Sequence, residues 1–112
     1  MQRREVGMGE GERLVRERLM ELRALCRRFG VAQLELFGSA LRDDFDFATS
    51  DLDFLVSLVP PAGVGYADAY FGLKEGLEEL FQRSVDLVSI GAVKNPHLRE
   101  AIERSKRTLY AA

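Results

Sequence analysis

Three aspartates have the residue type and spacing that metal-dependent chemistry requires. Asp51 and Asp53 flank Leu52, and Asp86 lies alone in a second apolar run, Val85 to Ile90. Residues two apart in a strand face the same side, so Asp51 and Asp53 would point to one spot. Acids cost free energy among apolar neighbours unless their charge is compensated. A cation is the natural compensation, and an oxygen-only ligand set without a His or Cys cluster suits Mg²⁺.

A Gly-Ser turn upstream adds a place for a phosphate. Gly38-Ser39 follows the apolar run Leu34–Phe37 and precedes a predicted helical turn, Ala40–Asp44. Backbone N–H groups at such a junction can hold an anion, and glycine lets a phosphate approach the backbone closely. Two divalent ions about 3.5–4 Å apart could activate an attacking hydroxyl and grip a leaving phosphate. The combination predicts phosphoryl or nucleotidyl transfer.

A reading without a metal is available for each aspartate alone. Asp51 could be an exposed strand-entry residue, and Asp53 could face solvent from an amphipathic strand. Asp86 could be the partner of a buried arginine. The coincidence of all three with Gly38-Ser39 in one small sheet favours the metal site.

The elements that must position these residues predict an α+β fold, a small mixed β-sheet flanked by helices. The order is helix, strand, short helix, strand, helix, strand, helix. The strands are expected at 34–37, 52–58 and 85–90, and the longer helices at 12–29, at 68–81 and from Asn95-Pro96 onward. The last helix should dock on the core through Leu98, Ile102 and Leu109.

The first helix is predicted from an apolar stripe that ends at a glycine. Its members recur at steps of four, three, four and three, with Gly30 at the expected C-cap position. Cys26 belongs to the stripe, which indicates a small buried hydrophobe rather than a reactive thiol. The stripe consists of Val15, Leu19, Leu22, Cys26 and Phe29.

Length and charge exclude several classes of protein. The 112 residues fit a single domain at 12–112 after a flexible lead-in at 1–11. A net charge of −2 gives no electrostatic footprint for bulk nucleic-acid binding. The sequence shows neither a bilayer-spanning apolar run nor a signal peptide, and it cannot form an internal disulfide with one cysteine. We therefore expect a cytoplasmic protein without a membrane partner.

The motifs resemble the nucleotidyltransferase superfamily typified by DNA polymerase β, and specifically its minimal nucleotidyltransferase branch. That family combines Gly-Ser, Asp-x-Asp and a third Asp on a following strand. The resemblance extends over residues 14–110 and rests on Gly38-Ser39, Asp51-Leu52-Asp53 and Val85-Asp86-Leu87. Eleven residues separate Ser39 from Asp51, one more than the family usually has.

The resemblance implies a polymerase β-like fold and Mg²⁺-dependent transfer of AMP from ATP to a hydroxyl. Asp51 and Asp53 would bind two Mg²⁺ ions, and Asp86 would complete the site of the ion that activates the hydroxyl. Gly38 and Ser39 would hold the triphosphate, assisted by Arg42.

The resemblance also implies a protein partner. Larger relatives carry an extra acceptor-binding domain, for which 112 residues leave no room, so the acceptor should be a separate macromolecule. Minimal nucleotidyltransferases are commonly antitoxins that silence a helical HEPN-type ribonuclease toxin by adenylylating a tyrosine. An HEPN-type toxin is therefore the expected partner, in a homo- or hetero-oligomer.

Two other functions compete with this one. A binding module could neutralise a toxin by contact alone, although it would not need three converging acids. A small-molecule nucleotidyltransferase could act as an oligomer, although the acceptor domain is missing.

Overall fold

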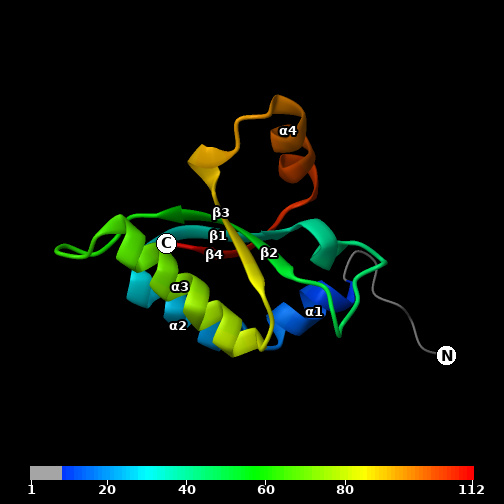
Figure 1. Cartoon of the computed structure of the whole chain (residues 1–112), viewed down its shortest axis with the longest axis horizontal. Coiled ribbons are helices and arrows are strands. Elements are labelled where there is room, and N and C mark those ends of the chain that lie inside the picture. Colours follow the sequence, from blue (N-terminus) through cyan, green and yellow to red (C-terminus); the bar gives the residue numbers. More distant parts are fainter. Residues whose placement is uncertain (1–8) are drawn as a thin grey trace.

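Four strands form one mixed sheet in the order β3-β2-β1-β4 (Figure 1). The structure is a computed structural model that describes residues 9–112. β1 pairs antiparallel with both β2 and β4, whereas β2 and β3 run parallel. The predicted α+β class is confirmed. The strands are β1 Val31–Phe37, β2 Leu52–Leu58, β3 Val85–Ser89 and β4 Arg107–Ala111.

Helices cover both faces of this sheet. α2 and α3 lie side by side on one face, and α4 lies over the other (Figure 1). Within residues 9–112 no helix is both long and apolar enough to cross a bilayer. The helices are α1 Glu10–Arg16, α2 Leu19–Phe29, α3 Tyr66–Phe81 and α4 Pro96–Ser105, with short 3₁₀ helices η1 Gly38–Leu41 and η2 Ile90–Ala92.

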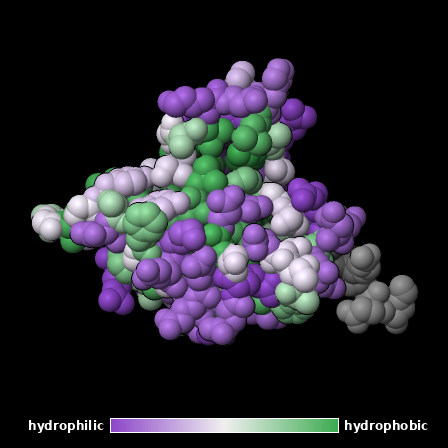
Figure 2. Space-filling view, in the orientation of Figure 1, coloured by the Kyte–Doolittle hydropathy of each residue, from purple (hydrophilic) through white to green (hydrophobic). Residues whose placement is uncertain are grey.

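The strand residues alternate between two apolar clusters. Leu36, Phe54 and Leu87 belong to the larger cluster, which α2 and α3 cover. On the other face Leu55 packs with Val93 and Ile102, and this smaller cluster ties α4 to the sheet. Hydrophobic surface is visible between α4 and the sheet, whereas the surface over α2 and α3 is mostly hydrophilic (Figure 2).

The N-terminal segment forms two helices where one was predicted. α1 ends at Arg16, and Arg18 leaves helical geometry with φ −116° and ψ 29° before α2 begins. The break lets α1 pack against η1, where a Cβ on Gly11 would overlap Ala40. α1 starts at Glu10, so the helical structure begins before the predicted boundary at residue 12, while residues 1–8 lie outside the described part.

Other predictions for this segment are confirmed. Gly30 caps α2 in the left-handed region at φ 75°. Cys26 is fully buried, and burial raises the pKa of its thiol to about 12, so the thiol stays protonated. The short helix predicted after β1 is present as the 3₁₀ helix η1, but it begins at Gly38, two residues before the expected start at residue 40.

The C-terminal segment contains a strand that was predicted to be helix. α4 begins as expected, because the Asn95 side chain accepts hydrogen bonds from the N–H groups of His97 and Leu98. Of the three residues expected to dock this helix, only Ile102 does so. Leu98 is 51% exposed, and Leu109 is buried in β4 instead. Pairing with the open edge of β1 stabilises the extended form of residues 107–111.

A buried carboxylate joins α4, β1 and β4. Glu35 is 2% exposed, and its oxygens accept hydrogen bonds from Gln33 Nε2 at 3.0 Å and Thr108 Oγ1 at 3.1 Å. Lys106 Nζ lies 3.1 Å from the other oxygen of Glu35 and 3.0 Å from the exposed Glu103. One lysine therefore pairs with one buried and one exposed acid.

We predict that Glu35→Gln destabilises the protein by about 1–3 kcal/mol, because Lys106 and the other partners of Glu35 lose a buried charged acceptor. The matched control is Glu103→Gln, which removes the exposed half of the same lysine pair and should cost less than about 0.5 kcal/mol. Urea denaturation gives both free energies of unfolding. Equal costs would contradict the assignment of Glu35 as the stabilising partner.

Candidate active site

The parallel pairing of β2 and β3 places two of the predicted aspartates side by side. Asp53 and Asp86 are register partners, so their side chains leave the same face of the sheet. That face is opposite the one covered by α2 and α3. Asp53 is half-buried and Asp86 is exposed. A carboxylate pair of this kind can meet a ligand from solvent.

The charges of this pair are not neutralised by the protein. Burial raises the pKa of the Asp53 carboxyl, and the nearby charges of Asp86 and Asp51 raise it further, against the lowering effects of the Ser39 N–H and Arg42. Among residues 9–112, no Lys, Arg or His forms an ion pair with any of these three aspartates. The alternative in which a buried arginine pairs with Asp86 is therefore wrong for the described residues.

Asp51 lies one residue before β2 and, unlike Asp53, has no register partner in β3. It is exposed, and its carbonyl accepts a hydrogen bond from Ser39 Oγ at 3.2 Å. In the described part of the chain, no three His, Cys, Asp or Glu side chains group closely enough to form a metal site. The structure pairs Asp53 with Asp86 in register, and Asp51 lies close enough for its charge to raise the pKa of Asp53, but the three carboxylates do not form a metal-binding group in this conformation. The donor chemistry still fits Mg²⁺, because it consists of carboxylate oxygens with uncompensated charge.

The Gly38-Ser39 turn packs directly on Asp53. Gly38 has φ 77°, and a Cβ there would overlap the Asp53 Oδ2 atom. The Ser39 N–H donates a hydrogen bond to the same oxygen at 3.4 Å. Glycine is required at position 38 for both its backbone conformation and this close approach. The structure thus places the predicted turn beside the predicted carboxylates.

Arg42 follows η1 and is the outermost predicted residue. Its N–H donates to the Ser39 carbonyl, and its Nε lies 3.3 Å from Asp44 Oδ1. Both side chains of this pair are mostly exposed. Arg42 lowers the pKa of Asp53, so its positive charge acts at the carboxylates from the edge of the site.

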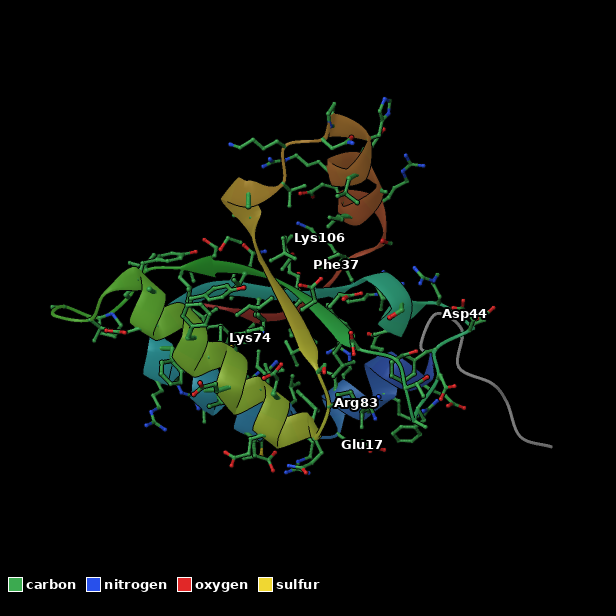
Figure 3. All side chains as sticks on the ribbon, viewed as in Figure 1. Glu17, Phe37, Asp44, Lys74, Arg83 and Lys106 are labelled. Carbon is green, nitrogen blue, oxygen red and sulfur yellow. The ribbon has the colours of Figure 1, made fainter. Side chains whose placement is uncertain are left out.

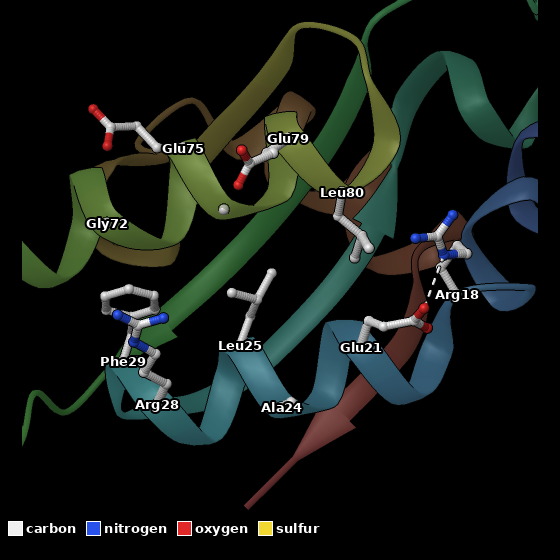
Figure 4. A pocket seen from close by; sticks show the side chains of 11 residues that line it. Arg18, Glu21, Ala24, Leu25, Arg28, Phe29, Gly72, Glu75, Glu79 and Leu80 are labelled. Carbon is white, nitrogen blue, oxygen red and sulfur yellow. Dashed lines mark hydrogen bonds and ion pairs between the residues drawn. The ribbon is translucent and has the colours of Figure 1, made fainter.

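A groove of about 900 Å³ between α2 and α3 is a separate feature (Figure 4). It lies on the opposite face of the sheet from Asp53 and Asp86. Cβ atoms on Gly72 and Gly76 would overlap Phe29 and Leu25, respectively. The two glycines of α3 therefore serve the packing of α3 against α2, and the groove holds none of the predicted site residues.

Arg83 is a residue near the site that the motif analysis missed. It lies just before β3, at the base of that strand in Figure 3. Its guanidinium donates hydrogen bonds to the carbonyls of Ser50 and Phe47, at 3.0 and 2.6 Å. The signal in the sequence is an arginine between a helix and the strand that carries Asp86, three residues before that aspartate.

Comparison with known proteins gives this geometry a family. The nucleotidyltransferase domain family matches residues 20–109, which include every predicted site residue. The chain belongs to that family. The resemblance predicted from the motifs is confirmed, and this nucleotidyltransferase is an enzyme whose substrate is a nucleotide.

Two relatives and one solved structure of similar fold match the chain over most of their lengths. A Methanocaldococcus jannaschii protein, provisionally named protein adenylyltransferase MJ0128, is 34% identical over 70% of this chain and 76% of its own. A solved structure provisionally named a minimal nucleotidyltransferase is 33% identical with a TM-score of 0.62, over 85% of this chain and 92% of that one. The third match shares only the fold. It is a chain of the solved complex of the tri-AMPylated Shewanella oneidensis HEPN toxin with MNT antitoxin, at 19% identity and a TM-score of 0.53, over 91% of this chain and 73% of that one.

We predict that Gly38→Ala removes nucleotidyl transfer and destabilises the protein by more than the roughly 1–2 kcal/mol that left-handed geometry costs a non-glycine residue. The added methyl group would displace Asp53. Gly63→Ala is the control, because Gly63 has φ 84° but no atom within 4 Å of its Cβ position. It should show only the conformational cost and keep full activity. Loss of activity in both variants, measured with unfolding in urea, would refute the specific contact at Gly38.

We also predict that Asp53→Asn stabilises the protein at pH 7 in EDTA. A carboxyl with a raised folded-state pKa binds its proton more tightly when folded, so its charge destabilises the fold above that pKa. The advantage of the Asn variant should vanish as the pH falls below the ordinary Asp value of about 3.9. Thermal melts across pH check this, with the exposed Asp43→Asn as the control that should change little. A less stable Asp53→Asn variant at pH 7 would contradict the prediction.

Proposed function

We propose that this nucleotidyltransferase transfers AMP from ATP to a hydroxyl of a partner protein, a tyrosine of an HEPN-type ribonuclease toxin. The observation that carries the proposal is the register pair Asp53 and Asp86, open to solvent and beside the Gly38-Ser39 turn. The name of the Methanocaldococcus jannaschii relative supports a protein acceptor. The AMPylated HEPN toxin in the structure of similar fold supports the class of partner.

The carboxylates would hold divalent metal at the reacting phosphate. Asp51, Asp53 and Asp86 are the proposed ligands, and Mg²⁺ would neutralise their repulsion and the charge that develops on the transferred phosphate. In the free protein only Asp53 and Asp86 share a register position. Asp51, which precedes β2, would complete the ligand set when the metal binds.

The transfer makes one phosphorus–oxygen bond and breaks another. The oxygen of the acceptor hydroxyl attacks the α-phosphorus of ATP and gives its proton to water, while the bond to the bridging oxygen of the β-phosphate breaks and pyrophosphate leaves. Gly38 and Ser39 would position the triphosphate next to Asp53, and Arg42 would add positive charge at its outer edge. Catalysis would then depend mainly on positioning and charge stabilisation.

An open site favours a macromolecular acceptor over a small molecule. Asp86 and Asp51 are both exposed, and the buried β2 residue that packs with Ile102 of α4 is Leu55, two positions beyond Asp53. A docking protein would exclude water and hold its hydroxyl in line with the α-phosphate. The AMP left on a toxin tyrosine would place negative charge near its RNA-binding surface and so oppose RNA binding.

We predict that a neighbouring gene encodes an HEPN-type toxin, and that incubation of this protein with that toxin, ATP and Mg²⁺ adds one or more AMP groups to a toxin tyrosine. Intact-mass measurement and peptide mapping of the toxin give the result. Asp53→Asn and Asp86→Asn should abolish the mass change while the variants stay folded by circular dichroism, and Asp43→Asn should leave it unchanged.

The alternative, a module that neutralises the toxin by contact alone, makes the opposite prediction. If the Asp51→Asn/Asp53→Asn double variant neutralises the toxin as well as the wild type does, and no mass change occurs, the transferase proposal is overturned. AMP on a small-molecule hydroxyl but never on the protein would instead overturn the proposed acceptor.

A further inference from the structure

We infer that Arg83 is a positioning residue that holds Asp51 and Asp53 at a fixed place relative to Asp86. The inference rests on the proposed function in taking these aspartates as ligands. Arg83 Nη1 donates to the Ser50 carbonyl at 3.0 Å, and Nη2 donates to the Phe47 carbonyl at 2.6 Å. One guanidinium thus binds the loop before β2 at two points.

Two aromatic rings hold the same guanidinium. Its central carbon lies 5.6 Å from the ring centre of Phe45 and 5.5 Å from that of Phe47, within the range of cation–π attraction. Phe45 is 9% exposed and belongs to the larger apolar cluster, so it anchors the loop to the core. Across residues 9–112 Arg83 has no acidic ion-pair partner. Its charge acts on the two carbonyl groups, on the two rings and, more weakly, on Asp46, whose pKa it helps to lower.

The contacts act where strand pairing does not. Asp51 precedes β2, so no β2–β3 pair fixes its backbone. The Leu52 N–H donates to the Ser84 carbonyl at 3.2 Å, and the Arg83 bond to Ser50 lies just before that contact. Arg83 therefore extends the connection between the two segments to the residue directly before Asp51. Asp86 follows Arg83 by three positions on the other segment.

Arg83 also contacts the loop that connects the Gly38-Ser39 turn to Asp51. Eleven residues separate Ser39 from Asp51. A compact turn forms in this loop, with the Ala48 N–H donating to Asp46 Oδ1 at 2.8 Å and the Asp46 N–H donating to Ser50 Oγ at 2.9 Å. Arg83 closes this turn against β3.

The test compares Arg83→Met and Arg83→Lys with the wild type and with Arg28→Met. The methionine keeps an apolar chain but removes every donor, and lysine keeps the charge without the fork that binds two carbonyls. Arg28 also lies over an aromatic ring, 5.2 Å from the centre of Phe29, but on the opposite face of the sheet. It controls for the loss of a cation–π contact alone.

Two readouts distinguish positioning from stability. Titration calorimetry with Mg²⁺ and a non-hydrolysable ATP analogue measures binding without turnover, and transfer assays give the half-saturating Mg²⁺ concentration and kcat separately. Arg83→Met should weaken Mg²⁺ binding by about 10- to 100-fold, as loss of residues that orient metal ligands does. Its kcat at saturating Mg²⁺ should fall much less. The Mg²⁺ affinity of Arg83→Lys should lie between those of the wild type and Arg83→Met. The Mg²⁺ affinity of Arg28→Met should match that of the wild type.

The outcomes separate this inference from the proposed function. Unchanged Mg²⁺ dependence in Arg83→Met and in Arg83→Lys, with or without lower stability, would overturn the positioning role alone. In another outcome, the wild type binds Mg²⁺, Arg83→Met binds it more weakly, and no AMP is transferred to any protein. That outcome would overturn the proposed acceptor and support the positioning role. Should Arg83→Met fail to fold, the binding shift of Arg83→Lys decides. Failure of the wild type to bind Mg²⁺ would overturn both.

Discussion

The parallel pairing of β2 with β3 sets two aspartates side by side, and the candidate site depends on that pairing. Parallel neighbours require a crossover connection, which here is α3. Because α3 buries Leu73 and Leu77 against one face of the sheet, the carboxylates must use the other face. The same topology that completes the core therefore produces two like charges at adjacent positions.

The structure around these charges relieves little of their repulsion. The Ser39 N–H and Arg42 lower the pKa of Asp53, but burial and the neighbouring acids raise it overall. Charges that structural stability required would be paired, as Glu35 is with Lys106 in the same molecule. Glu35 is buried and has three partners, whereas Asp53 is half-buried and has no cation paired with it. This contrast is what a ligand-binding role for Asp53 would produce.

Local sequence patterns were enough to predict β2 and the start of α4. The alternation of Leu52, Phe54 and Val56 gave β2 with its exact bounds, and the Asn95-Pro96 cap gave the start of α4. β4 was missed because residues 107–111 become a strand only through pairing with β1, about seventy positions earlier (37 to 107). The break at Arg18 was missed for a related reason, since the contact of Gly11 with Ala40 is tertiary.

The same distinction holds for the candidate site. Residue types and spacing indicated Asp53, Asp86 and Gly38, and the structure places these three next to one another. Spacing alone did not reveal that the Asp51 carbonyl accepts a hydrogen bond from Ser39 Oγ, or that Arg83 donates hydrogen bonds to the carbonyls before Asp51. Both facts depend on how a loop folds back against another segment, which periodicity does not encode.

The pairing of β1 with β4 has a consequence for the order in which the protein can fold. β1 ends at Phe37, so during synthesis it remains an edge strand with unpaired backbone groups until residues 107–111 are made. Over that interval Glu35, the one charged residue of β1, disfavours pairing with the edge of another chain. Lys106 then emerges directly before β4 and neutralises the charge as the strand docks. Glu35 would thus protect the open edge of β1 during translation and then, paired with Lys106, stabilise the finished fold.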